Sequence, residues 1–574
     1  MLVRPRLAKV TPRFHQTLHP LLQQILAARG VNTDDQLQLS LSGLLPPTTL
    51  KGMDESVALL MQALPQQKKL LIVADYDADG ATSCALAMLG LRALGFANID
   101  YLVPNRFEFG YGLTPPIVEI ARTLNPDVLI TVDNGIASNA GVALARQYGM
   151  QVLITDHHLP GDCLPAASAI LNPNQPGCAF TSKALAGVGV MFYLLLGLRK
   201  ALREQGHFGA SAEPNLAALL DLVALGTVAD VVPLDENNRR LVKHGIGLIR
   251  ALKARPGILA LLECAGRNPT TCVASDLGFA AGPRLNAAGR LDDMRLGIEC
   301  LLAEDPYKAR QMALQLDALN KDRRLIEQDM QETALRQLDT LALPADRRYS
   351  LCLYDPSWHQ GVIGILASRI KDRLHCPVLI FADAGTDEAG EALLKGSARS
   401  IAGVHMRDML DAVATHNPGL LEKFGGHAMA AGLTLARSRF DEFVQAFDAE
   451  VRAAVDEEIL AREVLCDGAL TVDCFTLEFA EQLRNLSPWG QHFPEPLFAD
   501  DFIVKGRRIL ADKHLKLTLA IPGASNQIDA IAFNQDLQTL ACQGEQVRLL
   551  YRLDVNEYRG ICVPQLVIEQ LEYL

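Results

Sequence analysis

Residues 68–80 read KKLLIVADYDADG, an apolar, β-branched run that breaks into acidic residues and a glycine. The next stretch, ATSCALAMLGLRALG at 81–95, carries apolar residues at helical spacing. Further short apolar runs follow, each ending in polar residues, at 98–106, 126–135, 150–158 and 167–173. Strands that alternate with helices in this way predict a parallel α/β sheet covered on both faces.

The polar residues at these strand ends are mostly acids. Together with the acid that ends GTVAD at 226–230, they are Asp75, Asp77, Asp79, Asp133, Asp156, His157, His158 and Asp230. The carboxyl ends of parallel strands meet at one edge of a sheet, where ligands bind. Clustered carboxylates repel one another unless a cation or protons neutralise them. Oxygen ligands with one or two imidazoles predict Mg²⁺ or Mn²⁺, as two ions about 3.5–4 Å apart.

Each of these pieces has an ordinary structural interpretation when taken alone. DADG and VDNG are common turn sequences, and a single histidine more often makes a hydrogen bond than binds a metal. Because several such pieces fall at strand ends of one predicted sheet, the metal-site interpretation is favoured.

The rest of the chain divides by pattern. Residues 1–45 contain a short amphipathic helix and no recognisable chemistry, and 46–303 hold the α/β sheet. Residues 304–342 form a long, charged helical stretch that predicts a connecting rod. A second α/β region is expected at 343–458, and short alternating runs at 463–574 predict a small barrel or sandwich.

Composition excludes several classes of protein. Of 574 residues, 49% are hydrophobic and 21% charged, which excludes a disordered chain. Lys and Arg number 54 against 66 Asp and Glu, so the formal net charge of −12 excludes a uniformly basic protein but not a local basic groove. The apolar run at 187–198 is shorter than the ~20 residues that span a bilayer. Without a signal-like N-terminus and with scattered cysteines, a cytoplasmic, soluble protein is expected.

The motifs DYDADGATS, TVDNG, TDHH and GTVAD, in this order, resemble those of the DHH phosphoesterase superfamily. Longer stretches resemble the bacterial exonucleases of this superfamily that are specific for single strands; they lie at 103–113, 185–195, 277–293, 358–373, 396–400 and 424–433. The resemblance covers nearly the whole chain from about residue 45. It implies a DHH domain, a DHHA1-like second domain that grips substrate, and a C-terminal OB-fold.

The resemblance also implies roles for residues. The metal ligands would be Asp75, Asp77, Asp79, Asp133, His157 and Asp230, with Asp133 as the bridge; Val73 stands where many members carry a histidine ligand. His158 would contact the scissile phosphate or assist the leaving group, and Asp156 would orient a histidine. Contacts to phosphate or sugar are expected from Arg106, Arg284, His359, Ser397, Arg399, Gly425, Gly426 and His427.

Several of these substrate contacts have physical support of their own. Arg399 lies in a glycine-flanked stretch, and arginine binds phosphate through a bidentate fork. The glycines of GGHAMAAG permit close backbone approach to a phosphate, although they serve equally to pack a helix on a strand. In the C-terminal region a basic strip beside Phe502, Phe533 and His514 fits single-strand binding, or is a solvated strand face; it comprises Lys505, Arg507, Arg508, Lys513 and Lys516.

The function implied is a metal-dependent 5′-to-3′ exonuclease that degrades single-stranded DNA to 5′-monophosphates in recombination, mismatch repair and base-excision repair. Single-strand-binding protein and a RecQ-type helicase are the expected partners, with no membrane association and a monomeric enzyme. Two alternatives stay open from the residues alone. One is a DHH phosphodiesterase for short oligoribonucleotides or cyclic dinucleotides, and the other is a non-catalytic single-strand-binding scaffold.

Overall fold

A computed structural model describes residues 2–15, 17–105, 109, 111–209, 212–340, 349–387, 389–455, 459, 463–535, 545–558 and 560–574. The chain forms two compact units. One comprises Met1–Arg4 with Ala318–Val464, and the other comprises Pro5–Asp317 with Leu465–Leu574. The boundaries expected at 45, 303, 342 and 458 stay predictions, since these units divide the chain differently.

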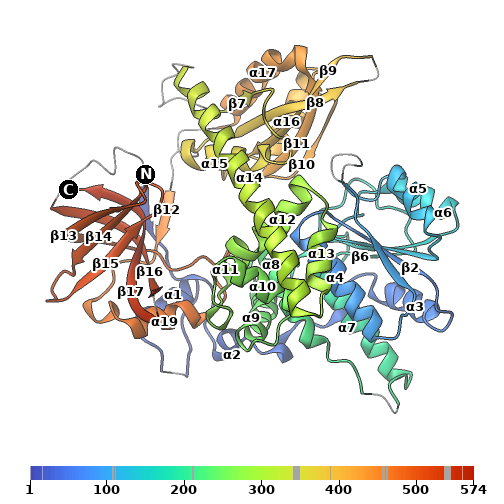
Figure 1. Ribbon diagram of the computed structural model, residues 1–574, viewed down its shortest axis with the longest axis horizontal. Coiled ribbons are helices and arrows are strands. Elements are labelled where there is room, and N and C mark those ends of the chain that lie inside the picture. The colour runs from blue at the N-terminus through green and yellow to red at the C-terminus, as the bar shows by residue number, and fades with distance from the viewer. Residues whose placement is uncertain are drawn as a thin grey trace. The chain divides into compact units, whose positions relative to one another are not determined.

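The larger unit contains the predicted parallel sheet, with strand order β3-β2-β4-β5-β6 (Figure 1). Its strands are β2 (Leu70–Ala74), β3 (Ile99–Leu102), β4 (Val128–Val132), β5 (Gln151–Thr155) and β6 (Ala169–Leu171). Every pair is parallel, and Ala74 of β2 pairs with Val132 of β4, which pairs with Thr155 of β5. The residues that follow these three strands therefore begin side by side at one edge.

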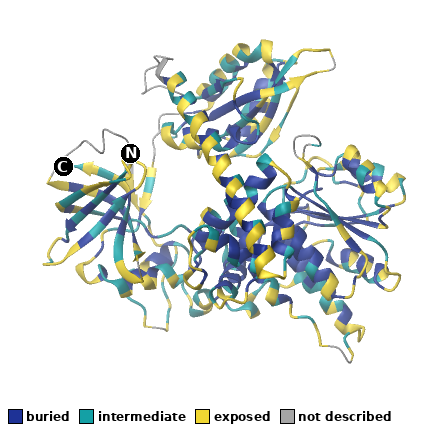
Figure 2. Cartoon of the chain, in the orientation of Figure 1, coloured by how far each residue is buried: buried dark blue, intermediate teal, exposed yellow. Residues whose placement is uncertain are grey.

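Helices cover both faces of this sheet and extend beyond it. They are α3 (Met53–Ala63), α4 (Ala78–Ala93), α5 (Pro115–Thr123), α6 (Asn139–Gln147), α7 (Gly187–Glu204), α8 (Leu220–Ala229), α9 (Glu236–Arg250), α10 (Pro256–Cys264), α11 (Ala274–Asp276), α12 (Gly282–Leu291) and α13 (Arg295–Leu302). A π-helical segment, η5 (Leu277–Ala281), leads into α12. Helices α4, α7 and α8 pack on one another and are buried along most of their length, because apolar residues surround them on all sides (Figure 2).

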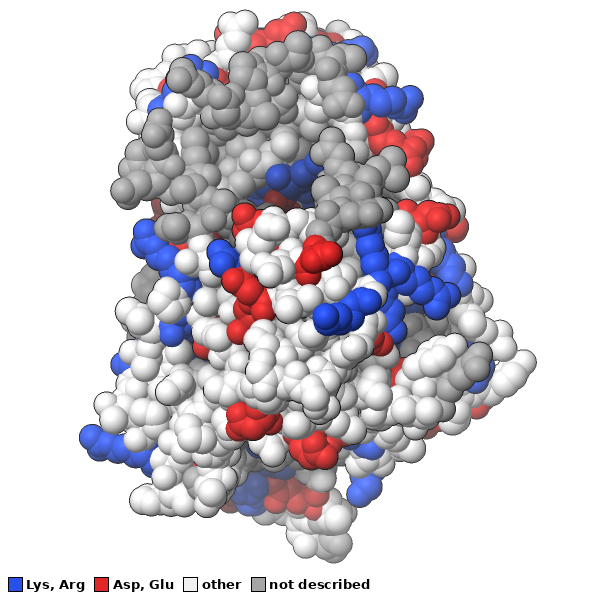
Figure 3. Space-filling view, turned by 90° about the vertical axis from the view of Figure 1, so that its left-hand side faces the viewer, with Lys and Arg blue, Asp and Glu red and all other residues white. Residues whose placement is uncertain are grey.

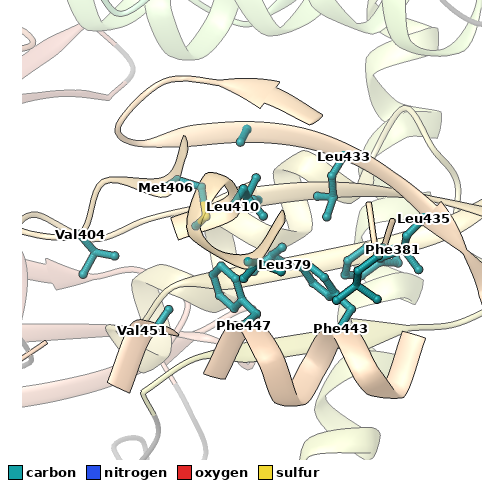
Figure 4. Packing of buried hydrophobic residues seen from close by; sticks show 14 of the residues in the cluster. Leu379, Phe381, Val404, Met406, Leu410, Leu433, Leu435, Phe443, Phe447 and Val451 are labelled. Atoms are coloured by element: carbon teal, nitrogen blue, oxygen red, sulfur yellow. The ribbon is translucent and has the colours of Figure 1, made fainter. Parts of the chain in front are cut away.

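The predicted long helix is confirmed as α14 (Pro306–Thr340). The smaller unit holds a mixed sheet of order β10-β11-β9-β8-β7. Its elements are β7 (Leu351–Tyr354), α15 (Ile363–Leu374), β8 (Val378–Thr386), β9 (Ala392–Arg399), α16 (Met406–His416), β10 (Lys423–Gly426), β11 (Ala430–Ala436) and α17 (Phe440–Ala454). Phe443 and Phe447 of α17 point at Leu379 and Phe381 of β8, which forms one core of this unit (Figure 4).

The predicted C-terminal barrel is confirmed as a closed sheet of order β13-β14-β15-β17-β16. Helix α19 (Leu477–Leu486) precedes the strands, which are β13 (Phe498–Leu510), β14 (His514–Ala520), β15 (Gln527–Ala532), β16 (Gln546–Tyr558) and β17 (Ile561–Tyr573). Leu515, Leu517 and Leu519 alternate into the interior, as a strand with one buried face requires. Closure leaves no free sheet edge in the body of the barrel.

The N-terminal segment contributes β1 (Leu2–Pro5), α1 (Pro20–Ala28) and α2 (Asp34–Gln38), and β1 pairs with β12 (Glu463–Cys466). Gly30 follows α1 with φ +83°, the left-handed conformation that ends helices. Among the described residues, none of the helices combines the length and apolar character needed to cross a membrane.

Candidate metal centre and nucleic-acid contacts

The carboxyl edge of the parallel sheet gathers the predicted acids. Asp75 follows β2, Asp133 follows β4, and Asp156 follows β5; all three side chains are buried. Asp133 has φ +61°, a left-handed conformation that aspartate tolerates better than most residues. Asn134 holds this turn, since its Nδ2 donates to the carbonyl of Val132 at 2.9 Å and to that of Val73 at 3.1 Å.

Two further acids lie at helix N-termini. Asp77 caps α4, and its Oδ1 accepts a hydrogen bond from the amide of Gly80 at 3.0 Å. Asp79 is 1% exposed and accepts hydrogen bonds from the first amides of α7, those of Gly187 at 2.6 Å and Val188 at 2.9 Å. Backbone amides and the helix dipole favour a carboxylate at this position.

His157 joins the sheet edge to the helices. Its Nε2 lies 3.1 Å from Oδ1 of Asp133, 3.4 Å from Oδ2 of Asp230 and 3.9 Å from Oδ2 of Asp79. Asp230 is the residue that ends α8. Ligand atoms of Asp75, Asp77 and Asp133 lie within 4.8 Å of one another, as do those of Asp79, His157 and Asp230.

This arrangement suits divalent cations. Burial, followed by the charges of Asp79 and Asp77, raises the pKa of Asp133 well above its usual range. Burial and then the charge of Asp79 do the same to Asp230. The pKa of Asp79 rises to about 7, because burial and Asp77 outweigh its hydrogen bonds. Several carboxylates whose charges disfavour one another, joined by one imidazole, form the oxygen-rich donor set of Mg²⁺ or Mn²⁺.

His158 has a different environment from His157. Its Nδ1 lies 2.7 Å from Oδ1 of Asp156, whose Oδ2 accepts the amide of Ile136 at 2.9 Å. Burial lowers the pKa of His158, but the hydrogen bond and charge of Asp156 outweigh it and raise that pKa to about 9. The Tyr111 hydroxyl lies 3.1 Å from Nδ1 of His158 and donates to the Asp133 carbonyl at 3.2 Å. The structure thus places an imidazole, paired with a buried carboxylate, at the edge of the acidic cluster.

The predicted contacts of the smaller unit lie on neighbouring strands. Arg399 on β9 pairs with Ala430 of β11, and Gly426 on β10 pairs with Ala431. The Arg399 guanidinium donates to Oγ of Ser397 at 3.2 Å and to the Ala398 carbonyl at 2.8 Å.

The remaining predicted residues of this unit are Gly425, His427 and His359. Gly425 belongs to the same strand as Gly426, and the amide of His427 donates to the Ala430 carbonyl across the hairpin turn. The His359 carbonyl accepts the amides of Val362 and Ile363 at the start of α15.

Two of the predicted substrate contacts, Arg106 and Arg284, belong to the larger unit. Arg106 lies outside the described residues. Arg284 is buried on α12, where its Nε donates to Oδ1 of Asp317 at 2.9 Å and its Nη1 donates to the Ala280 carbonyl at 2.7 Å. These internal contacts account for the burial of Arg284 without a substrate, and a contact of Arg284 to phosphate or sugar stays a prediction.

The basic strip of the barrel lies on β13, on β14 and in the turn between them. Lys505, Arg508 and Lys513 are exposed, whereas Arg507 and Lys516 are half-buried and Lys516 pairs with Asp529 at 2.7 Å. Phe533 is 49% exposed and meets the ring of His514 edge-on at 5.3 Å. Phe502, by contrast, is buried and presents no surface for stacking.

Some residues that shape the site were missed. Tyr111, Asn134 and Asn286 are in this group; Oδ1 of Asn286 accepts the amide of Ala78 at 2.9 Å. The Asn-Gly pair after Asp133 is a turn signal that indicates only a bend, not the two hydrogen bonds that Asn134 makes across β2 and β4. Tyr111 and Asn286 are single polar residues with no local pattern to distinguish them.

Three family models match the chain: the DHH family, N-terminal domain over residues 69–227, the DHHA1 domain over 348–453 and the RecJ OB domain over 466–570. The single-stranded-DNA-specific exonuclease RecJ of Salmonella typhimurium is 51% identical over 99% of this chain and 98% of its own length. That of Escherichia coli is 52% identical over 96% of each chain. The crystal structure of RecJ with Mn²⁺ from Thermus thermophilus has a TM-score of 0.79 at 31% identity, over 97% of this chain and 76% of that one. A structure of the same relative with Mg²⁺ has a TM-score of 0.74 at 29% identity, over 97% of this chain and 75% of that one.

Proposed function

The chain belongs to the RecJ family of single-stranded-DNA-specific exonucleases, and we propose that it removes nucleotides from the 5′ end of single-stranded DNA as 5′-monophosphates. The observation that carries this proposal is the buried cluster of acids around His157 at the carboxyl edge of the sheet. A cluster of this kind serves phosphoryl chemistry, because it holds metal ions against a phosphate.

The cofactor that this donor set supports is a pair of Mn²⁺ or Mg²⁺ ions. Their ligands would be Asp75, Asp77, Asp79, Asp133, His157 and Asp230, with Asp133 between the two ions. Such ions, when bound, activate a water molecule and neutralise the charge of the phosphate. The protein holds the ligands in place through the amides of α7 and the turn at Asp133–Asn134.

His158 is the proposed proton donor. Release of a 5′-monophosphate breaks the bond between phosphorus and the 3′ oxygen, and that oxygen must gain a proton as it leaves. A pKa of about 9 keeps His158 protonated near neutral pH, and Asp156 fixes the orientation of its ring. Tyr111 contacts the His158 ring from a second side and so limits its rotation.

Substrate would be held by two further surfaces. Ser397, Arg399, Gly425, Gly426 and His427, together with His359, would contact phosphates from the smaller unit; Arg106 and Arg284 would do so from the larger one. The barrel would hold the strand through Lys505, Arg507, Arg508, Lys513 and Lys516, with Phe533 stacking on a base. Figure 3 views the molecule from the side on which Figure 1 draws the barrel, and Lys and Arg gather there in groups despite the net charge of −12.

The decisive test uses a 3′-labelled single strand with a free 5′-phosphate, beside 5′-blocked, 3′-blocked and duplex versions. Each is incubated with Mn²⁺ or Mg²⁺, with and without chelator. We expect metal-dependent loss of the strands with free single-stranded 5′ ends, including the 3′-blocked strand, and release of 5′-monophosphates. Asp133→Ala should abolish the loss, while Asp162→Ala, which removes an exposed carboxyl, should leave it unchanged.

Other outcomes would contradict the proposal. Degradation of the 5′-blocked strand would show the opposite polarity. Cleavage of a dinucleotide with survival of every long strand would indicate a small-substrate phosphodiesterase. Binding without cleavage under all metal conditions would indicate a scaffold.

The cellular context proposed here follows from the family. A single-strand exonuclease consumes strands that a helicase exposes and that single-strand-binding protein covers. We therefore infer action in recombination, mismatch repair and base-excision repair, with a RecQ-type helicase and single-strand-binding protein as partners, in the cytoplasm. The test incubates a blunt duplex with the enzyme, with and without such a helicase. Degradation is expected only when the helicase is present.

A further inference from the structure

Arg29, the residue that ends α1, makes a buried contact with a residue 438 positions away. Its Nη1 and Nη2 donate to the two carboxylate oxygens of Asp467 at 2.7 and 2.9 Å, and both side chains are almost fully buried. Nε donates to the Pro494 carbonyl at 2.8 Å and Nη1 also donates to the Ile25 carbonyl at 2.9 Å. The guanidinium lies 5.4 Å from the ring centre of Trp489. This bidentate geometry is specific to arginine.

Asp467 lies where the chain begins to form the barrel. It follows β12, its amide donates to the Leu497 carbonyl at 2.6 Å, and its Oδ2 accepts the Leu497 amide at 3.1 Å. Leu497 immediately precedes β13, the first strand of the barrel. The Arg29–Asp467 pair therefore holds the base of the barrel to α1.

The same N-terminal segment is fixed to α9 at its other end. Arg240 of α9 is buried, its Nη1 donates to the Ser40 carbonyl at 2.8 Å, and its Nη2 lies 3.0 Å from Oδ2 of Asp35. Lys243, one turn along, donates to the Gln38 carbonyl at 2.8 Å. We call residues 6–45 the N-terminal strap. In Figure 1 its helices α1 and α2 lie beside α19 and α9 respectively.

Helix α9 connects the strap to the metal centre. It packs along α8, and α8 ends at Asp230, one of the proposed ligands. A second contact supports the same joint: the guanidinium of Arg239 lies 4.1 Å from the ring centre of Phe493, and the amide of Leu234 donates to the Gln491 carbonyl at 2.8 Å. The segment that leads into the barrel thus contacts both the strap and α9.

We propose that the N-terminal strap fixes the barrel relative to the metal centre, and that Arg29 and Asp467 are positioning residues for long strands. This inference rests on the proposed role of the barrel in holding the strand. A long strand must reach both the barrel and the metal centre, so its binding depends on their spacing. A dinucleotide reaches only the metal centre, and its hydrolysis is independent of the strap.

The test compares KM and kcat for a dinucleotide and for a strand of about 24 nucleotides, long enough to occupy a barrel site as well. Arg29→Lys keeps the charge but loses the bidentate fork, and Asp467→Asn keeps the shape but loses the charge. Both variants should raise KM for the long strand about tenfold, because a small displacement of a binding surface misaligns the strand. Hydrolysis of the dinucleotide should stay within about twofold of wild type.

Arg203→Lys is the matched control, since Arg203 also pairs with a carboxylate through two hydrogen bonds, to Glu213, but on an exposed surface. This variant should leave KM and kcat unchanged for both substrates. If both strap variants kept the wild-type preference for the long strand, the proposed role of the strap would be wrong. The proposed role of the barrel would still stand. A wild-type enzyme without any length preference would overturn the barrel's role and the strap together. Equal losses on both substrates, or failure of both variants to fold, would show that the pair only stabilises the unit.

Discussion

His158 has a pKa that lies above its ordinary value although the ring is largely enclosed. Burial alone would favour the neutral imidazole, so the raised pKa comes from Asp156, which accepts hydrogen bonds from the ring and from the amides of His157 and His158. Asp156 itself has a lowered pKa, because the interaction with His158 outweighs the effect of its burial. Both shifts favour the charged forms of the pair, which suits a proton donor.

We expect His158→Asn to lower kcat on a DNA strand by about 10²–10⁴-fold, the usual contribution of a general acid. KM should change little, because the proton is needed only as the 3′ oxygen leaves. The p-nitrophenyl ester of thymidine 5′-monophosphate provides the measurement. Its leaving group needs no proton, so the variant should cleave this ester nearly as fast as wild type.

Tyr111→Phe is the control for this prediction. It removes the hydroxyl beside His158 but retains the ring contact at 5.6 Å between centroids. We expect a modest change in kcat that is equal for the DNA strand and for the p-nitrophenyl ester. If His158→Asn lost both activities equally, the residue would act in metal binding or folding instead.

Gly187 shows how closely the metal centre is packed. A Cβ at this position would lie 2.7 Å from both Cβ and Oδ1 of Asp133. Gly187→Ala should therefore displace the Asp133 carboxylate and lower kcat at least tenfold, with a weaker apparent affinity for Mn²⁺. A titration of activity against Mn²⁺ concentration measures both effects.

Gly247→Ala is the matched substitution, because a Cβ on this glycine of α9 meets nothing within 4 Å. Activity should be unchanged, and the free energy of unfolding should rise by up to about 1 kcal/mol from helix propensity. Full activity in Gly187→Ala would show that Asp133 tolerates the displacement.

At the scale of single elements, the strand ends could be predicted from the sequence and the contacts between elements could not. The apolar run before Asp75 indicates both the strand and its end, because a buried parallel strand reads as a continuous apolar stretch. Arg284 looks like a phosphate ligand in its local sequence, but its partner Asp317 lies 33 residues further along. Phe502 and Phe533 look alike in sequence, but the alternation of β13 turns Phe502 into the barrel.

Two residues on the outside of the barrel, Arg508 on β13 and Phe533 after β15, offer a test of strand binding. Arg508 pairs across the ladder with Lys516, and Phe533 follows β15 beside His514. Phe533→Ala should weaken binding of a long single strand by about 1–3 kcal/mol, the usual value of one stacked base. Arg508→Ala should reduce the salt dependence of binding by about 0.7 in the slope of log K against log salt. Fluorescence anisotropy in the presence of chelator measures binding without cleavage.

Ile561→Ala is the control for Phe533→Ala, since Ile561 is 67% exposed at the start of β17 and lies outside the basic strip. Its affinity for the strand should match wild type. Equal losses in Phe533→Ala and Ile561→Ala would mean that the barrel holds the strand without a defined stacking position.

For the whole molecule, the acidic cluster predicts a stability that depends on divalent ions. The metal-free protein carries buried carboxylates that repel one another, and ions that bind only the folded state relieve this. Mn²⁺ at about 100 times its dissociation constant should add about 2.7 kcal/mol to the free energy of unfolding. Thermal unfolding with Mn²⁺ and with chelator measures the difference, and Asp133→Ala should lose it. An unchanged midpoint in wild type would contradict the metal site.

The organisation of the whole chain was the least predictable from sequence. Residues 1–45 carry no motif, but their helices are bound to α9 and to the base of the barrel. Nothing in the local pattern around Arg29 indicates Asp467, because a long-range ion pair leaves no periodicity in either segment. The parallel sheet and the barrel, by contrast, are each built from segments close in sequence, and both were predicted.

The Arg29–Asp467 pair also sets an order for biosynthesis. Arg29 leaves the ribosome long before its partner, which is 438 residues later. At about 5–20 residues per second, the strap waits roughly 20–90 seconds for Asp467. During that interval the parallel sheet can fold, but the guanidinium of Arg29 has no carboxylate partner and the joint stays open. The joint between α1 and the base of the barrel can therefore close only after most of the chain has been made.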